Sequence, residues 1–358
     1  MFPLGKDSRR REERKFKRVV VFRTGHLGDT ICAIPAFRLL RNFYNDAKVF
    51  LICDSSQQGK VAVIDIINRF DIFEKVFSYK SNKGFSSIWQ LFRLIRQIKP
   101  DILIQLPQQK KKQSQLNLQL LFFRLSGIKK LAGFNHICSE GDWKMNEPAR
   151  LIKILNNEGI YGYKPAYHIE VQPAATDSVL QKLKSIGIGP FEDYIIFCGG
   201  GKCGTQKWPN NRYAQVLKDI HRSTKVPIIA IGTDEELHLY EKEILPEFPQ
   251  LNMITVTIDE LFELLRSAKC YIGNDTGPMH AAAAVGCPVT GIISARNLPG
   301  QWDPDIESRL LIRHRTDCEG CWLDKCIKEN HKCMMSITVP EVINEVQPFI
   351  KKLIETRG

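Results

Sequence analysis

Three glycine-containing segments place residues capable of acid–base or phosphate chemistry directly after short apolar runs. The first, residues 23–30 with the sequence RTGHLGDT, follows the apolar run 19–22 and carries Asp29 after Gly25 and Gly28. The glycines allow a tight turn between a strand and a helix. Asp29 then either stabilises the helix start or faces a ligand as a general base. The spacing Gly-x-x-Gly does not match the dinucleotide fingerprint Gly-x-Gly-x-x-Gly.

The second segment, residues 198–209, has the sequence CGGGKCGTQKWP and follows another apolar run. It combines unsubstituted backbone amides with the Thr205 hydroxyl and the ammonium groups of Lys202 and Lys207, which together suit a diphosphate. A Walker loop needs Gly-Lys followed by Ser or Thr, whereas Gly204 is followed by Thr205 and Gln206. The sequence therefore does not support an ATPase.

The third segment, residues 273–284, has the sequence GNDTGPMHAAAA. Pro278 is well placed as one of the first residues of a helix, because its missing N–H would have no partner there. Thr276 and Gly277 would then present backbone amides at the helix N-terminus, which is a ready anion site. His280 lies one turn into that helix, and we expect it to contact the ligand.

A fourth pattern consists of cysteines. Cys318, Cys321, Cys326 and Cys333 fall within sixteen residues. Four thiols this close could hold a structural zinc or iron ion, although the gaps match no standard finger and a loop of reduced thiols is the alternative. The total of 11 cysteines is odd and no export signal precedes them, which favours a reducing compartment.

The elements that position these segments follow an alternating pattern from residue 18 onward. Apolar runs of strand length alternate with helical patterns, as expected for parallel sheets covered by helices. The predicted strands are 19–22, 49–53, 102–106, 194–198, 226–231, 270–272 and 289–293. The predicted helices are 30–43, 88–98, 178–186, 213–221, 261–267, 279–285 and 342–354.

The alternation weakens between residues 135 and 173 and then restarts, which predicts two α/β halves. We expect a basic lead over residues 1–17, a first domain over 18–172, a second domain over 173–338 with the cysteine-rich loop 318–333, and a terminal helix in 339–358.

The charge balance favours anionic partners. The chain of 358 residues carries 51 basic and 39 acidic side chains, a net charge of +12. The basic lead is either a solvated terminus or a membrane-surface contact. Lys110, Lys111 and Lys112 either begin a solvated helix or line a site for an anionic acceptor.

A nucleic-acid-binding module is a further alternative, but basic and aromatic residues do not interleave as it would require. No apolar run is long enough to span a bilayer.

Taken together, the motifs resemble a known family. Residues 27–29 (LGD) with 33–36 (AIPA), then 207–209 (KWP), then 273–280 (GNDTGPMH) with 286–288 (GCP) occur in the order found in family-nine glycosyltransferases. These are the heptosyltransferases of lipopolysaccharide core synthesis, and the resemblance covers roughly residues 18–350.

The resemblance implies the GT-B architecture, with two Rossmann-like domains whose parallel sheets face a cleft. The second domain would bind the donor nucleotide, the first the acceptor, and the C-terminal helix would pack back toward the first domain. It further implies inverting, metal-independent transfer of heptose from ADP-heptose to a lipopolysaccharide inner-core acceptor. Another sugar nucleotide, or a protein acceptor as in the autotransporter branch, stays open; that branch is associated with iron at its cysteine-rich segment.

The resemblance also assigns roles to residues. Asp29 would be the general base, and Lys207 would hold the donor phosphates. Glu236 would bind the ribose, or else be only a helix-start acid. The implied partners are ADP-heptose and an anionic glycolipid, with no nucleic acid, and the implied location is the cytoplasmic face of the inner membrane. The remaining donor-side candidates are Thr205, Asp275, Thr276, Gly277 and His280, and the acceptor-side candidates are Gly28, Lys110, Lys111 and Lys112.

Overall fold

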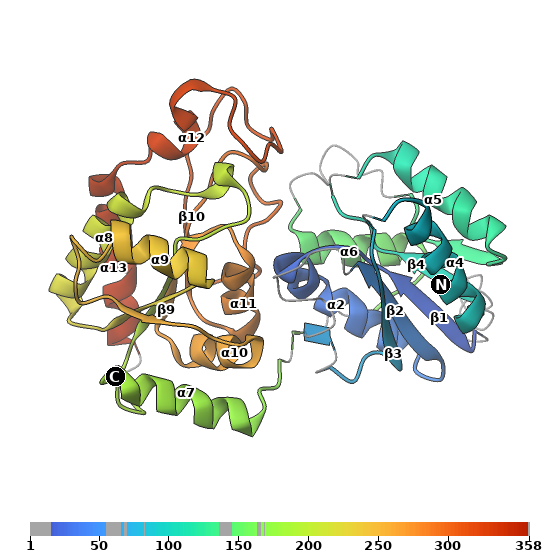
Figure 1. The fold of residues 1–358 in the computed structure, drawn as a ribbon, viewed down its shortest axis with the longest axis horizontal. Helices are drawn as coiled ribbons and strands as arrows, with labels where there is room; N and C mark the ends of the chain where they lie inside the picture. The colour runs from blue at the N-terminus through green and yellow to red at the C-terminus, as the bar shows by residue number, and fades with distance from the viewer. Residues whose placement is uncertain are drawn as a thin grey trace, which may run out of the picture. The chain divides into compact units, whose positions relative to one another are not determined.

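The chain forms two compact units, Met1–Tyr167 and His168–Gly358, in a computed structural model (Figure 1). The structure describes residues 16–54, 66–67, 70–81, 83–109, 111–135, 145–162, 166–167 and 169–356. Most of the basic lead and Lys110 lie outside these ranges. Within the ranges described, no helix combines the length and the apolar character that crossing a bilayer requires.

The first unit is a parallel sheet with the strand order β3-β2-β1-β4-β5. Its central strands are continuous apolar runs because a parallel sheet is covered on both faces. The described elements are β1 (Arg18–Phe22), α2 (Leu27–Phe43), β2 (Lys48–Asp54), β3 (Lys75–Tyr79), α4 (Phe85–Ile98), β4 (Ile102–Gln105), α5 (Gln113–Leu125), β5 (Lys130–Ala132) and α6 (Glu147–Asn157).

Helix α6 lies in the region where the sequence pattern is weak. Asn146 caps its first turn by accepting a hydrogen bond from the Ala149 amide at 3.1 Å. The helix packs against α2 and buries Leu151 and Leu155 completely. This contact brings α6 beside the helix that carries Asp29.

The second unit is a parallel sheet with the order β11-β10-β9-β6-β7-β8. Three of its helices start with a capping box, in which a threonine and a glutamate three residues later exchange hydrogen bonds with backbone amides. The described elements are α7 (Pro173–Ser185), β6 (Ile195–Cys198), η2 (Gly204–Gln206), α8 (Asn210–Thr224), β7 (Ile228–Ile231), α9 (Asp234–Glu243), β8 (Asn252–Ile254), α10 (Ile258–Ser267), β9 (Cys270–Asn274), α11 (Gly277–Val285), β10 (Val289–Ile292), β11 (Arg309–Ile312), η3 (Glu329–His331), α12 (Lys332–Met335) and α13 (Val339–Glu355).

The C-terminal helix α13 packs within the second unit. It contacts α8 and β11, and its residues Val342, Val346 and Ile350 are fully buried in that unit's core. These contacts account for the apolar face that the sequence predicts over residues 342–354.

The two sheets confirm the predicted α/β class with parallel strands. In each unit the carboxyl ends of the central strands lead into the segments that the sequence analysis singled out: β1 into residues 23–30, β6 into residues 199–207 and β9 into residues 275–280. Ligands of open parallel sheets bind at this edge.

Candidate functional site

Asp29 occupies the third position of helix α2, after His26 as the N-cap. Its carboxylate oxygen Oδ2 accepts a hydrogen bond from the His26 backbone amide at 2.9 Å, so it stabilises the helix start. Its side chain is 15% exposed. The first-turn position that the sequence predicts for Asp29 is therefore observed. Gly28 lies within the same first turn rather than in the preceding loop.

Gly25 leaves space for that carboxylate. A Cβ atom built on Gly25 would lie 2.4 Å from the Asp29 Cβ and 2.8 Å from its carboxyl carbon. Real Cβ atoms do not approach other atoms this closely. The absence of a side chain at residue 25 therefore permits the position of Asp29.

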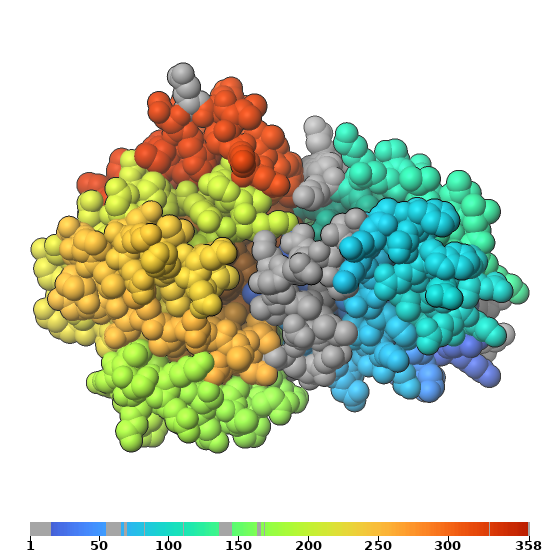
Figure 2. Space-filling model, in the orientation of Figure 1, coloured from blue at the N-terminus to red at the C-terminus, as the bar shows by residue number. Residues whose placement is uncertain are grey.

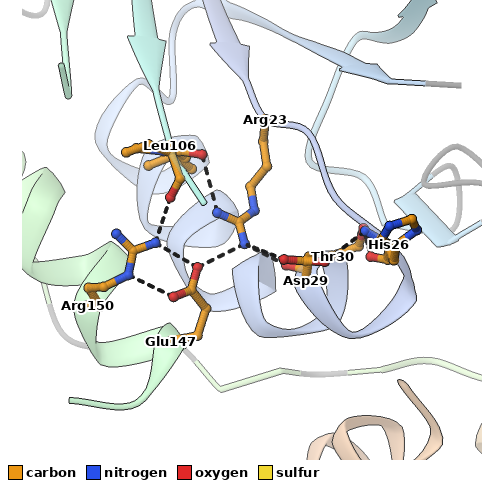
Figure 3. A network of polar contacts seen from close by, with 8 residues as sticks. Arg23, His26, Asp29, Thr30, Leu106, Glu147 and Arg150 are labelled. Carbon is orange, nitrogen blue, oxygen red and sulfur yellow. Dashed lines mark hydrogen bonds and ion pairs between the residues drawn. The ribbon is translucent and has the colours of Figure 1, made fainter. Parts of the chain in front are cut away.

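A buried ionic network lies beside Asp29 (Figure 3). Arg23, at the end of β1, donates through Nη2 to the Asp29 carbonyl oxygen at 3.0 Å and to Glu147 Oε1 at 3.0 Å. The same nitrogen lies 4.0 Å from the Asp29 carboxylate. Arg150 donates to Glu147 from Nε and from Nη2, each at 2.7 Å. The network ties β1, α2 and α6 together.

Glu147 is the anion at the centre of this network, and its side chain is completely buried. Burial alone would raise the pKa of Glu147, but the charges and hydrogen bonds of Arg150 and Arg23 outweigh it and hold the pKa below the usual value. No local sequence pattern predicted the network. Its one signal was an arginine placed directly after a buried strand.

The lysines proposed to face an acceptor lie at the start of α5. Lys110 lies outside the described residues. Lys112 is the exposed N-cap residue of α5, and burial lowers the pKa of the half-buried Lys111. Because α5 follows the carboxyl end of β4, Lys111 and Lys112 lie toward the sheet edge that also carries Asp29.

In the second unit, Asn274 joins the glycine-rich segment to β9. Its side-chain amide is fully buried and donates to the carbonyl oxygens of Gly199 at 2.6 Å and Gly200 at 3.2 Å. Its Oδ1 accepts hydrogen bonds from the Trp208 amide at 3.2 Å and the Tyr213 hydroxyl at 2.8 Å. One side chain therefore holds both ends of the 199–208 loop, a role that the sequence did not reveal.

Lys207 and the start of α11 meet at this loop. A Cβ atom on Gly201 would lie 3.3 Å from the Thr276 methyl group and 3.7 Å from Lys207 Cγ, so Gly201 lies against both. Thr276 is the N-cap of α11 and Gly277 its first residue. Among the described residues, no ion pair engages the Lys207 ammonium group. A cation and a helix N-terminus thus both lie against Gly201, and together they suit an anion.

Asp275 and His280 are both buried and fix the start of α11. The Asp275 carboxylate accepts hydrogen bonds from the side-chain amides of Gln206 and Asn297, each at 3.1 Å. Its other oxygen lies 3.6 Å from His280 Nε2. The ring of His280 also packs edge-on against Trp302. These contacts position the helix start; direct ligand contact by either residue stays a prediction.

Glu236 lies at the third position of α9 and serves two segments. Its Oε2 accepts the Thr233 amide at 3.0 Å, and its Oε1 accepts the Gly201 amide at 3.0 Å. A Cβ atom on Gly200 would lie 2.1 Å from Glu236 Oε1. Glu236 is therefore a helix-start acid, which is one of the two interpretations drawn from the sequence. It also holds the glycine loop through its hydrogen bond from the Gly201 amide. Its ribose role stays a prediction.

Thr205 connects the glycine loop to the cysteine-rich loop. Its buried hydroxyl donates to the Leu323 carbonyl at 2.6 Å. Arg296 reinforces this connection by donating to the Leu323 carbonyl at 2.9 Å and to the Asp324 carboxylate at 2.9 Å. The Thr205 proton is therefore already engaged, and its predicted phosphate contact gains no support from this geometry.

The four cysteines of that loop do not form a metal site in the described part of the chain. No group of three or more His, Cys, Asp or Glu side chains there is placed to hold an ion. Cys326 is exposed and Cys333 is buried. Burial raises the pKa of the Cys333 thiol, and the neighbouring Cys318, Cys326 and Cys321 raise it further. Metal binding by these thiols stays a prediction.

The chain resembles known proteins over most of its length. Residues 163–331 match the model of glycosyltransferase family 9 (heptosyltransferase). Lipopolysaccharide heptosyltransferase 3 of Escherichia coli is 21% identical over 288 residues, which are 75% of this chain and 81% of that protein. A family 9 glycosyl transferase of Veillonella parvula superposes with a TM-score of 0.71 at 19% identity, covering 94% of this chain and 97% of that one. E. coli ADP-heptose lipopolysaccharide heptosyltransferase II superposes with a TM-score of 0.67 at 16% identity, covering 96% and 100%.

The two parallel-sheet units and these superpositions show that the chain has the GT-B fold. Within that fold, residues 163–331 match the glycosyltransferase family 9 (heptosyltransferase) model, and the chain as a whole is similar to lipopolysaccharide heptosyltransferases.

Proposed function

We propose that the protein transfers heptose from ADP-heptose to an acceptor of the lipopolysaccharide inner core, with inversion at the anomeric carbon. The observation that carries the donor assignment is the packing of Gly201 against both Lys207 and Thr276. It unites an ammonium group with the N-terminus of α11, and these two features together suit a diphosphate. The names of the relatives, which refer to ADP-heptose and to lipopolysaccharide, supply the donor and acceptor classes.

The reaction needs opposite charges at its two ends. Asp29 accepts the proton of the acceptor hydroxyl as that oxygen bonds to the anomeric carbon. The bond between that carbon and the phosphate oxygen breaks, and the electron pair leaves with ADP. Lys207 and the α11 amides stabilise the charge that develops on the departing diphosphate. The network of Arg23 and Glu147 holds the helix turn that carries Asp29.

The donor assignment is tested by titration calorimetry with ADP, UDP and GDP. ADP should bind most tightly, and Lys207→Met should weaken its binding about tenfold or more, because a charge-assisted contact to phosphate is lost. Lys218→Met is the matched control, since Lys218 pairs with Glu247 on the exposed side of α8. Tighter binding of UDP than of ADP would show that the donor is a UDP-sugar. Unchanged ADP affinity in Lys207→Met would show that Lys207 does not bind the donor phosphates.

The base assignment is tested by mass spectrometry of the product formed from ADP-heptose and inner-core acceptors. Asp29→Asn should bind ADP normally and slow transfer about 100- to 10,000-fold, the range that general base catalysis contributes. Asp71→Asn, an exposed carboxylate of the same unit, should transfer normally. Full activity of Asp29→Asn would exclude Asp29 as the base.

A further inference from the structure

Helices α4 and α5 expose apolar residues on their outer faces. Half of the twelve large hydrophobic residues that are exposed in the described part of the chain lie on these two helices. Each set follows helical spacing and so forms a single stripe. We call the combined surface the α4–α5 face. Its apolar residues are Phe85, Ile88 and Trp89 on α4 and Leu118, Leu121 and Leu125 on α5.

The opposite faces of both helices are already buried. Leu91 and Ile95 of α4, and Leu116 and Phe123 of α5, belong to one core cluster with β1 and β4. A helix at a water-facing surface normally has one apolar stripe and a polar remainder. The second, outward stripe therefore calls for a partner of its own.

The two helices lie on the same face of the sheet. Both connections run in the same direction along it, from β3 to β4 and from β4 to β5, so right-handed crossovers place α4 and α5 together. A Cβ atom on Gly127, just beyond α5, would lie 3.7 Å from Nη1 of Arg96 on α4. Figures 1 and 2 show the two segments adjoining. The two stripes thus belong to one surface.

The stretch of sequence that contains both helices has a large net positive charge. Residues 80–130 contain eleven Lys or Arg and one acidic residue, Asp101, so they carry +10 of the net +12. Neither helix contains an acidic residue. Asp101 accepts hydrogen bonds from the backbone amides of Lys17 and Arg18. Arg93 is exposed on α4, with its guanidinium 5.8 Å from the centre of the Trp89 ring.

We propose that the α4–α5 face, together with Arg93, Arg96 and Arg124, binds the surface of an anionic lipid bilayer. Aromatic and leucine side chains would enter the headgroup region while the arginines pair with lipid phosphates. Nucleic acid would use the charge but not the apolar stripes, and a neutral apolar partner would use the stripes but not the charge. An anionic bilayer, which is charged at its surface and apolar inside, uses both.

This surface also has a place in the proposed reaction, and this step rests on the proposed function. Helix α5 starts from the carboxyl edge of the sheet, where Asp29 lies. A bilayer held on the α4–α5 face would present lipid-linked acceptors to the unit that carries the base. Vesicle binding itself requires no glycosyl transfer. The membrane proposal can therefore be refuted without refuting the proposed transfer reaction, and the reverse also holds.

Flotation of the full chain with vesicles tests the charge. The protein should float with vesicles of phosphatidylglycerol and phosphatidylcholine in equal parts, and not with phosphatidylcholine alone. Arg93→Gln/Arg96→Gln/Arg124→Gln should weaken the partition about a hundredfold, since each basic residue near an anionic surface contributes about fivefold. Added salt should weaken wild-type binding because it screens the surface charge.

A second variant tests the apolar stripes. Trp89→Ser/Leu121→Ser/Leu125→Ser should weaken partition at least about tenfold while ADP binding stays unchanged. Leu180→Ser/Phe191→Ser/Leu239→Ser is the matched control, because these three residues are exposed singly on the second unit. It should float as wild type does. Brominated lipid should quench wild-type tryptophan fluorescence, and Trp89→Phe should lose most of that quenching.

Three results would overturn the proposal. If both α4–α5 variants floated with vesicles as well as the wild type does, membrane binding would belong to the basic lead or to another surface. Self-association that the Ser variant abolishes, without any flotation of the wild type, would assign the face to a second copy of the chain. Retention on DNA without vesicle binding would assign it to nucleic acid.

Discussion

Glu147 keeps its negative charge at a position that water does not reach. Its two oxygens accept hydrogen bonds from Arg23 and Arg150, which are themselves nearly inaccessible. A buried ion is tolerated only when its partners replace the lost hydration. Removing this one carboxylate would take from two buried guanidinium groups the anion that both of them contact.

Glu147→Gln should therefore destabilise the protein strongly. We expect a loss of about 3–5 kcal/mol, the range measured when one partner of a buried ion pair is removed. Urea unfolding followed by circular dichroism measures it. Glu74→Gln is the control, because Glu74 pairs with Lys48 on the surface and such pairs contribute about 1 kcal/mol or less.

The same pair of proteins gives a pH test. The folded pKa of Glu147 lies below the ordinary value of 4.5, so the unfolded state takes up protons first as the pH falls. The advantage of wild type over Glu147→Gln should be full above that ordinary value and shrink as the pH falls through the folded pKa. A difference that does not change with pH would show that Glu147 is not ionised in the folded protein.

The sequence could predict a site residue only where the signal for it lies in residues that are close along the chain. Asp29 and Lys207 were identifiable because each lies in a glycine-containing segment after a buried strand, where ligands bind. Arg23 and Glu147 are 124 positions apart, and no local pattern links them. Asn274 was visible in its motif, but its contacts to Gly199 and Trp208 depend on the pairing of β6 with β9.

At the scale of the elements, central strands were predictable and edge strands were not. β1, β4, β6 and β7 are apolar runs because helices cover both of their faces. The missed strands β3, β5, β8 and β11 lie at the edges of the two sheets. They are short or half-exposed, and each includes a charged residue or asparagine. Their positions follow from pairing with the neighbouring strand rather than from hydrophobicity.

Strand β9 ends at Asn274, whose side chain holds the 199–208 loop that follows strand β6. Asn274→Ala should free the 199–208 loop, because the hydrogen bonds of its side chain to Gly199, Gly200, Trp208 and Tyr213 are lost. We expect ADP binding to weaken about tenfold and stability to fall by about 1–3 kcal/mol, as for buried polar groups left unpaired. Calorimetry and urea unfolding measure the two effects.

The control for this substitution is Asn252→Ala, since Asn252 lies on the half-exposed strand β8. It should bind ADP as wild type does. If Asn274→Ala also bound ADP with wild-type affinity, the shape of the glycine loop would not depend on this side chain.

At the scale of the whole molecule, each unit has a hydrophobic core of its own. The residues assigned to the donor phosphates all come from the second unit. ADP should therefore slow hydrogen exchange of the amides in residues 199–207 and 275–280, because a ligand protects the segments that it contacts. The amides of β1 to β5 should exchange at unchanged rates. Protection centred on Asp29 instead would contradict the donor site.

The division into two α/β halves could be predicted because the alternation of strands and helices stops and restarts. The sequence gives the net charge of the chain but not where that charge lies on the folded protein. The basic lead draws attention first, yet residues 80–130 carry +10. That Arg93 and Arg96 of α4 lie near Arg124 of α5 becomes clear only once the sheet order puts the two helices side by side.

Gly25 limits how this enzyme could be redesigned. Even the methyl group of alanine would collide with Asp29, so a library that randomises residue 25 should yield active members only with glycine. Efforts to broaden the range of accepted sugars should therefore vary positions away from this turn, such as Lys112, whose side chain is exposed.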